Sequence, residues 1–289
     1  MPRLRLVLAG TLALGLALTG CARLAQGSNV SPTPPSPSVD PDALLLRVQT
    51  GGGFVAPEFA LGQMPEFSLM ADGRVITLGP QIEIYPGPSL PSVQVRTLTA
   101  RGIEAVMDAA RKAGLDGPDR AYDTQPIADA PTTTFTFVEG GRRHVISAYA
   151  LDTGGQPRPG GTSGEARARR ALADLRSKLF DLEHWLPAGS VGAESRFAFD
   201  GLRVYVEPGA TRDVGLQEPP LDWPLAVPLA TFGSPVAGRQ ELRCGTVEGT
   251  DLAALRPLAG RSNQLSPWRS GGAEYTLVLR PLLPDESGC

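Results

Sequence analysis

The chain has 289 residues, of which 42% are hydrophobic and 20% are charged, and this length corresponds to about two domains. Its 34 glycines and 28 prolines indicate many turns and little long helix, which excludes a coiled coil. The formal net charge of −3 offers no basic surface for phosphates, so we expect no nucleic-acid partner.

Residues 1–20 have the pattern of a secretory signal peptide. Arg3 and Arg5 precede an apolar run from Leu6 to Leu18, which is shorter than the roughly 20 residues that span a bilayer. The run ends at Leu18-Thr19-Gly20-Cys21, which resembles the lipobox of bacterial lipoproteins at every position. That resemblance implies cleavage before Cys21 and stable anchoring to the membrane by two or three acyl chains on this residue. The alternatives are a plain secretory signal with a coincidental cysteine and an uncleaved anchor helix.

Residues 21–42 are expected to form a tether on the extracytoplasmic face of the cell membrane. The segment 27–42 (GSNVSPTPPSPSVDPD) carries five prolines, which favour an extended chain with a reach of roughly 50 Å. Removal of residues 1–20 takes away two arginines and leaves 25 basic and 30 acidic residues, a formal net charge of −5. We therefore expect the folded part to stand away from the membrane. A disordered tail would predict the same separation.

Residues 43–188 are expected to form a first α+β domain. Alternation at Leu44, Leu46 and Val48 predicts a strand, and Phe67–Ala71 with Arg74–Leu78 around Asp72-Gly73 predicts a hairpin with a type I′ turn. Further strands are predicted over residues 81–85 and 93–97, followed by a helix from a cap at Thr99 to Gly114. After this helix the pattern predicts a hairpin over 132–138 and 142–150, a surface loop over 152–164 and a helix over 165–185. In that last helix, leucines form one stripe, and Arg167, Arg169, Arg170 and Arg176 lie on other faces.

Residues 189–289 are expected to form a second α+β domain. The pattern predicts a hairpin over 197–199 and 202–206, strands over 226–231, 239–246 and 275–283, and a short helix from about residue 250. The fold class is therefore α+β, with antiparallel sheets, a few helices packed on one face and two subdomains. Whether the two subdomains are a duplication stays open.

The three cysteines predict one disulfide bond. If Cys21 is acylated, Cys244 and Cys289 remain, and an even remainder in an oxidising compartment indicates a pair. The alternative is a reactive thiol at Cys244, although no histidine lies near it in sequence.

No catalytic motif is present, and we expect neither a cofactor nor a metal site. The two histidines, His144 and His184, are 40 residues apart, and His144 is expected to be an exposed cross-strand residue. Four aspartates crowd one acidic segment and allow either a calcium site or a solvated loop (Asp116, Asp119, Asp123 and Asp129). Paired carboxylates that hydrolyse envelope polysaccharide also stay possible, because this chemistry needs no histidine.

A resemblance to emfourin-like domains, which are small bacterial inhibitors of thermolysin-type metalloproteases, is carried by three parts of the chain. They are the segment Leu44–Phe54 (LLLRVQTGGGF), the helix Thr99–Leu115 and the hairpin 132–150. The resemblance falls within residues 44–186 and departs by about twenty inserted residues before the helix. It implies that Gly51, Gly52, Gly53, Phe54 and Val55 form the presented binding surface. The glycine triplet is alternatively a β-bulge or a strand end.

These observations favour a membrane-anchored, non-enzymatic binding protein of the cell envelope whose ligand is unknown. A protease-inhibitor module and a carboxylate-dependent hydrolase are the alternatives.

Overall fold

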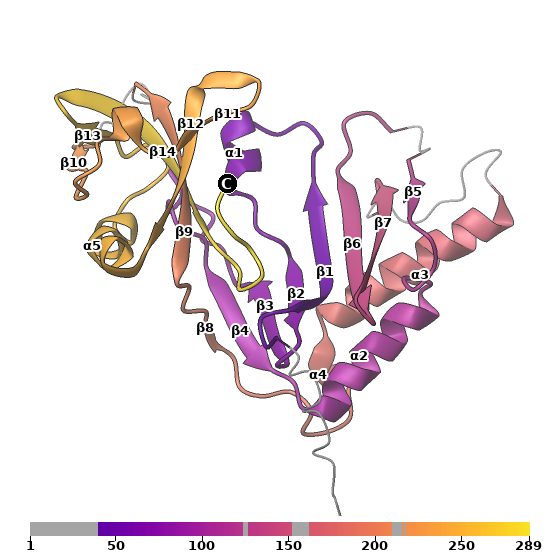
Figure 1. The fold of residues 1–289 in the computed structure, drawn as a ribbon. Helices are drawn as coiled ribbons and strands as arrows, with labels where there is room; N and C mark the ends of the chain where they lie inside the picture. Colours follow the sequence, from indigo (N-terminus) through magenta and orange to yellow (C-terminus); the bar gives the residue numbers. More distant parts are fainter. Residues whose placement is uncertain (1–39, 124–126, 152–161, 210–215, 217) are drawn as a thin grey trace, which may run out of the picture. The chain divides into compact units, whose positions relative to one another are not determined.

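The fold contains two β-sheets with helices against them, which confirms the α+β class and the two sheet-bearing subdomains (Figure 1). A computed structural model describes residues 40–123, 127–151, 162–209, 216 and 218–289. Cys21 and the rest of the predicted lipobox lie outside these residues. None of the helices within them combines the length and the apolar character that a bilayer crossing needs.

The first sheet has eight strands in the order β5-β7-β6-β1-β2-β3-β4-β8. Neighbouring strands are antiparallel except β5 and β7, which run parallel. The strands are β1 (Leu44–Gly51), β2 (Phe67–Met70), β3 (Arg74–Leu78), β4 (Val93–Thr97), β5 (Arg120–Tyr122), β6 (Thr132–Glu139), β7 (Arg142–Tyr149) and β8 (Ser195–Arg196).

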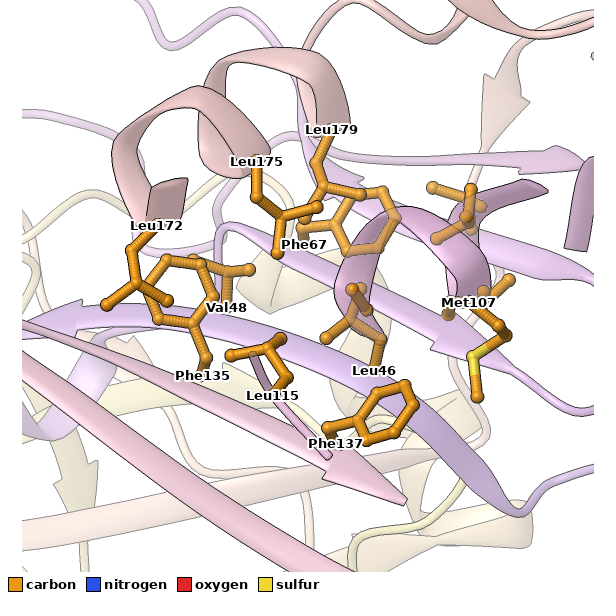
Figure 2. Packing of buried hydrophobic residues seen from close by; sticks show 14 of the residues in the cluster. Leu46, Val48, Phe67, Met107, Leu115, Phe135, Phe137, Leu172, Leu175 and Leu179 are labelled. Carbon is orange, nitrogen blue, oxygen red and sulfur yellow. The ribbon is translucent and has the colours of Figure 1, made fainter. Parts of the chain in front are cut away.

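Helices α2 (Ala100–Lys112), α3 (Ser163–Leu179) and α4 (Leu182–Trp185) contribute to the core on one face of this sheet. Figure 2 shows Leu172, Leu175 and Leu179 of α3 above strand residues Phe67 and Phe135. These leucines recur every three or four positions, which places them on one helix face and explains why α3 packs against the sheet. The hydroxyls of Thr99 and Thr162 accept hydrogen bonds at the starts of α2 and α3.

The second sheet has six strands in the order β10-β13-β14-β9-β12-β11. Its strands are β9 (Gly201–Pro208), β10 (Leu221–Asp222), β11 (Ser234–Val236), β12 (Arg239–Glu248), β13 (Trp268–Ser270) and β14 (Ala273–Pro281), and its helices are α5 (Gly249–Ala259) and the 3₁₀ turn η1 (Leu229–Thr231). Its core contains an aromatic group in which Trp223 meets Trp268 and Phe232 edge to face. Such contacts add to the burial of apolar area.

A third apolar cluster includes the face of the first sheet that points away from α2 and α3. It joins Met70 of β2 and Ile76 of β3 to Phe197 and Leu283. Phe197 follows β8, and Leu283 follows β14. Chain segments next to the second subdomain therefore cover the first sheet.

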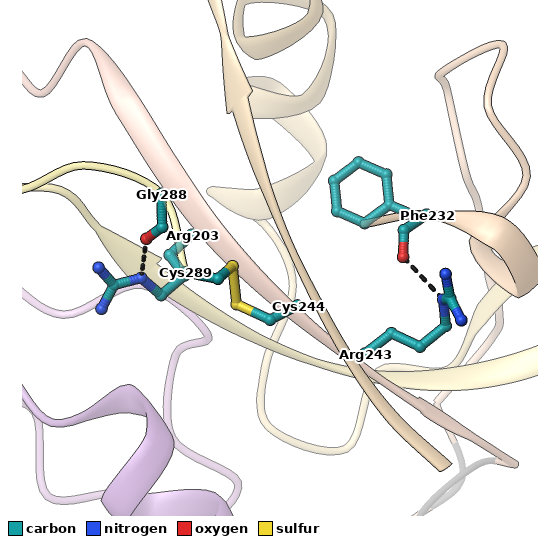
Figure 3. The surroundings of a disulfide bond; sticks show 6 residues. All are labelled: Arg203, Phe232, Arg243, Cys244, Gly288 and Cys289. Atoms are coloured by element: carbon teal, nitrogen blue, oxygen red, sulfur yellow. Dashed lines mark hydrogen bonds between the residues drawn. A yellow bond between two sulfur atoms is a disulfide. The ribbon is translucent and has the colours of Figure 1, made fainter. Parts of the chain in front are cut away.

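The predicted disulfide is present between Cys244 of β12 and Cys289, whose Cα atoms lie 6.0 Å apart (Figure 3). Beside it, Arg203 Nε of β9 donates to the carbonyl oxygen of Gly288 at 2.6 Å. Both contacts hold the last residues of the chain against the second sheet.

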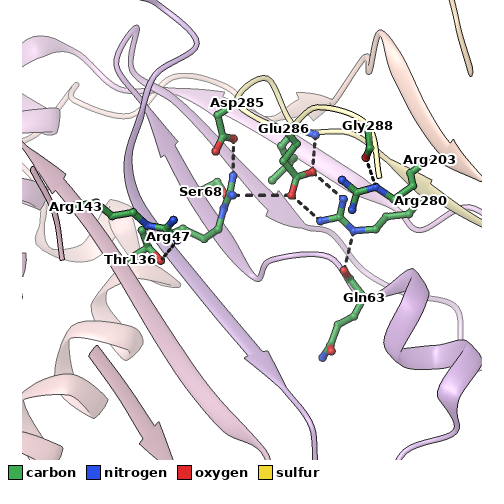
Figure 4. A network of polar contacts seen from close by, with 11 residues as sticks. Arg47, Gln63, Ser68, Thr136, Arg143, Arg203, Arg280, Asp285, Glu286 and Gly288 are labelled. Carbon is green, nitrogen blue, oxygen red and sulfur yellow. Dashed lines mark hydrogen bonds and ion pairs between the residues drawn. The ribbon is translucent and has the colours of Figure 1, made fainter. Parts of the chain in front are cut away.

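The residues just before that end also bind the first sheet (Figure 4). Arg280 of β14 makes two hydrogen bonds to Glu286, at 2.7 and 2.8 Å, and its side chain is only 6% exposed. Arg47 of β1 pairs with Asp285 at 2.6 Å. Burial by itself would raise the pKa of Glu286, but the hydrogen bonds and charge of Arg280, with smaller contributions from Leu283 and Arg47, hold it below its ordinary value.

Several predicted elements are confirmed. Helix α2 begins after its cap at Thr99, and Gly114 beyond it has φ of +86°. The β6–β7 hairpin turns at Gly140-Gly141, both with positive φ, as a type I′ turn requires. The β2–β3 hairpin also forms, but only Gly73 has positive φ there, so the predicted type I′ turn is wrong.

Two predicted strands do not form. In residues 81–85, the Gln81 amide donates to the carbonyls of Gly79 and Ser92, and its oxygen accepts from the Ser92 amide. This side chain satisfies backbone groups beside the segment, and Ile82 and Ile84 stay 66% and 60% exposed. In residues 226–231, Pro228 precedes the turn η1 and has no N–H for a strand ladder.

Three other details differ from the expectation. The hairpin over 197–206 is wrong, because residues 197–199 form no strand and the two residues before them, β8, pair with β4 of the first sheet. The helix over 165–185 is divided, because Asp181 leaves helical geometry at φ −135°. Arg169 is buried, and it donates to the carbonyls of Tyr122, Tyr149 and Ala150.

Protonation of Glu286 should destabilise the fold in acid. Its folded-state pKa lies below the unfolded value, so the stabilisation is complete above the unfolded pKa and is lost as pH falls through the folded pKa. We expect Glu286→Gln to lower the free energy of unfolding at neutral pH by about 1–3 kcal/mol. The difference from wild type should shrink below about pH 4.3. Urea denaturation across pH measures both effects.

The exposed Glu104 of α2 supplies the control, and Glu104→Gln should leave the free energy of unfolding within about 0.5 kcal/mol of wild type. A difference between Glu286→Gln and wild type that is the same at every pH would contradict the prediction.

Candidate binding surface

Three exposed apolar side chains follow the end of β1, two of them in the loop before helix α1 (Pro57–Gly62) and one in the helix itself. Phe54 is 91% exposed, Phe59 is 58% exposed and Val55 is 42% exposed. We call Phe54, Val55 and Phe59 the Phe54 surface. Single exposed apolar residues are common, but three within six positions of the chain are a local concentration, and exposed apolar area is a feature of interaction sites.

The backbone before Phe54 takes a conformation that favours glycine. Gly52 and Gly53 have φ of +76° and +79°, a region where a side chain meets the backbone. A Cβ atom on Gly53 would lie 3.0 Å from the carbonyl oxygen of Asp129, whereas one on Gly52 would meet nothing within 4 Å. Gly53 therefore lets the loop lie directly against residues 129–131.

The neighbouring segment 127–131 is itself fixed by Tyr149 of β7. The Tyr149 hydroxyl accepts from the amide of Ala130 at 3.0 Å and donates to the carbonyl of Ile127 at 2.6 Å. Both segments thus lie beside the ends of β1, β6 and β7, and strand pairing fixes those ends.

The start and the end of the loop are also bonded to each other. The hydroxyls of Thr50 and Thr133 lie 2.9 Å apart across β1 and β6. The side-chain amide of Gln63, just after α1, donates to the carbonyl of Thr50. The carbonyl of Gln63 accepts from Arg280 Nε at 2.9 Å, which is also drawn in Figure 4. Arg280 therefore connects the loop to the Glu286 network.

The histidines do not meet. His144 is only 8% exposed, and its Nδ1 lies 2.6 Å from the carbonyl of Gly117, so the prediction of an exposed residue is wrong. His184 lies on α4, exposed and beside Asp181.

Of the four aspartates considered for calcium, Asp119 accepts a hydrogen bond from the Val145 amide at 2.9 Å. Within the described residues, no three His, Cys, Asp or Glu side chains are grouped so that they could hold a metal ion.

The carboxylates do not gather in either of two cavities. One, of about 340 Å³, lies at the start of α3 and has Glu165 as its one carboxylate among the described lining residues. The other, of about 730 Å³, lies between residues 80–93 and α5, and its lining residues in the described part of the chain include no carboxylate. Glycoside hydrolysis needs two carboxyl groups on either side of the bond that breaks, and neither cavity offers that arrangement.

The sequence predicted a binding surface at residues 51–55, of which Phe54 and Val55 are exposed, but it did not indicate two other features of the structure. Phe59 belongs to a short helix that had no periodic signal, and the 730 Å³ cavity combines segments more than 100 residues apart. No protein-family model matches the chain, and no curated protein matches it.

Gly53→Ala should lower stability more than Gly52→Ala. Both variants force an alanine into left-handed geometry, which costs about 1–2 kcal/mol. Only Gly53→Ala adds a close contact with the Asp129 carbonyl, so its loss in the free energy of unfolding should be the larger by about 1 kcal/mol. Urea denaturation of both variants tests this, and equal losses would show that the loop is not held against residues 129–131.

Proposed function

We propose that this protein is a membrane-anchored, extracytoplasmic lipoprotein that binds a protein partner of the cell envelope through the Phe54 surface and catalyses no reaction. The single observation that carries the binding role is a 91% exposed phenylalanine on a loop held at both ends. Aromatic side chains contribute much of the binding energy at interfaces. A loop already fixed in one conformation loses little entropy on binding.

The anchor rests on the sequence. The lipobox-like Leu18-Thr19-Gly20-Cys21 and the proline-rich segment after it support a folded part held at a distance from the membrane. The net charge of −5 after cleavage supports the same arrangement, because anionic lipid headgroups repel such a surface.

Inhibition of a metalloprotease is the second candidate. The resemblance to emfourin-like domains implied a presented surface at residues 51–55, and Phe54 and Val55 are exposed there. A carboxylate-dependent hydrolase has less support, because neither cavity contains two carboxylates among its described lining residues.

Replacement of Cys21 tests the anchor. Cys21→Ser removes the thiol that the acyl chains need, so we expect the protein to leave the membrane fraction and appear in the soluble extracytoplasmic fraction. Immunoblotting of fractionated cells measures the distribution. Retention of Cys21→Ser in the membrane would contradict lipid anchoring, and Cys244→Ser with Cys289→Ser controls for a general effect of losing cysteine.

Crosslinking from position 54 tests the binding surface. A photoreactive phenylalanine analogue in place of Phe54 should give one discrete adduct in intact cells, and the fold should tolerate it because the side chain is 91% exposed. The same analogue at Val227, which is 50% exposed beside the second sheet, is the control and should give none. Equal crosslinking from positions 54 and 227, or no crosslinking from either, would contradict binding through the Phe54 surface. An adduct with a metalloprotease would favour the second candidate, inhibition of a metalloprotease.

A further inference from the structure

The 730 Å³ cavity, which we call the Phe197 groove, is separate from the Phe54 surface. One wall is the segment between β3 and β4, and the other is formed by residues 196–199 and the end of α5. Its volume falls in the range of small-molecule sites, about 300–1000 Å³. The lining residues are Pro80, Gln81, Ile82, Pro88, Leu90, Pro91, Ser92, Val93, Arg196, Phe197, Ala198, Phe199, Arg256, Ala259 and Gly260.

Hydrogen bonds fix both walls of the groove. The Ser89 amide donates to the carbonyl of Ser262 at 3.1 Å, and the Gln264 amide donates to the carbonyl of Gly87 at 2.9 Å. At the floor, the Phe197 amide donates to the carbonyl of Val93 at 2.9 Å. The groove is thus formed before any ligand binds, which reduces the entropy that binding costs.

The groove walls offer little to a peptide backbone. Pro80, Pro88 and Pro91 have no N–H group. The polar atoms of Gln81 are already bonded to Gly79 and Ser92. What the walls present instead is apolar surface, which suits a ligand that buries a hydrocarbon chain.

Two arginines and no carboxylate stand among the described residues that line the groove. Arg256 stacks 4.3 Å from the centre of the Phe199 ring and donates to the Phe199 carbonyl at 2.7 Å, but a carbonyl does not neutralise its charge. Among the described residues, neither Arg196 nor Arg256 forms an ion pair, whereas Arg74, Arg96 and Arg280 each pair with a carboxylate. An acidic protein therefore places two uncompensated positive charges beside one apolar groove.

We propose that the Phe197 groove binds a fatty acid or a similar single-chain amphiphile with a carboxylate headgroup. The hydrocarbon chain lies along Ile82, Leu90 and Phe197, and the carboxylate is held by Arg196 and Arg256. The chain removes apolar surface from water, and the guanidinium groups supply charge-assisted hydrogen bonds. This site does not depend on the role of the Phe54 surface.

Calorimetric titration with dodecanoate below its micelle concentration tests the proposal. The protein is the full chain carrying Cys21→Ser, so that no acyl chain of its own competes. We expect one molecule bound per chain, weaker binding of decanoate by up to about fourfold per missing methylene, and weaker binding still of dodecyltrimethylammonium, which has the same chain and the opposite charge.

Variants locate the ligand. Arg196→Gln with Arg256→Gln should weaken dodecanoate binding at least tenfold, and so should Ala198→Phe, which fills the groove from an exposed position. Arg142→Gln on β7 is the matched control and should bind within twofold of wild type. Unchanged urea midpoints establish that each variant folds. No binding of dodecanoate, equal binding of the cationic amphiphile, or affinity unchanged in both groove variants would overturn the proposal.

Discussion

The ion pair between Arg280 and Glu286 is the interaction on which the relation of the two sheets depends. Arg280 lies near the end of β14 in the second sheet, and its side chain is almost completely buried. A guanidinium in that position without a carboxylate would be strongly unfavourable, so Glu286 must return to it after a tight turn. Asp285 then reaches Arg47 on the first sheet. The bond from Cys289 to Cys244 closes a segment with a sequence separation of 45 and, on the chain-entropy model, contributes about 4 kcal/mol by restricting the unfolded chain.

The same pair also positions the candidate binding loop. Arg280 donates to the Gln63 carbonyl, and the Gln63 side chain donates to Thr50 at the end of β1. A Cβ atom on Gly62 would lie 3.2 Å from Val278 of β14, so helix α1 rests closely on the second sheet. The Phe54 surface therefore follows a strand of the first sheet and is held in place by contacts with the second sheet. The Phe197 groove likewise combines segments from both subdomains.

Local patterns in the sequence were enough for the elements whose hydrogen bonds are local. Three predictions that depend only on neighbouring residues are confirmed. They are the helix cap at Thr99, the turn at Gly140-Gly141 and the leucine face of α3. Three of the errors have a different cause, which is a partner distant in sequence. His144 is buried because Gly117 accepts from it, Arg169 because three backbone carbonyls surround it, and β8 joins β4 rather than β9. The glycine triplet indicated the loop before α1. No local sequence pattern could indicate the Phe197 groove, because its walls come from segments that are far apart in the sequence.

The segment around Ile82 and Ile84 has a consequence for behaviour in solution. Two β-branched residues alternate with charge and stay outside any sheet, so the stretch resembles the edge strands through which copies of a protein stack into fibrils. Glu83 lies between them. In a stack of identical strands its carboxylates would repeat about every 4.8 Å, and their mutual repulsion opposes growth. A charge between the two exposed isoleucines therefore disfavours pairing of this segment between copies of the chain.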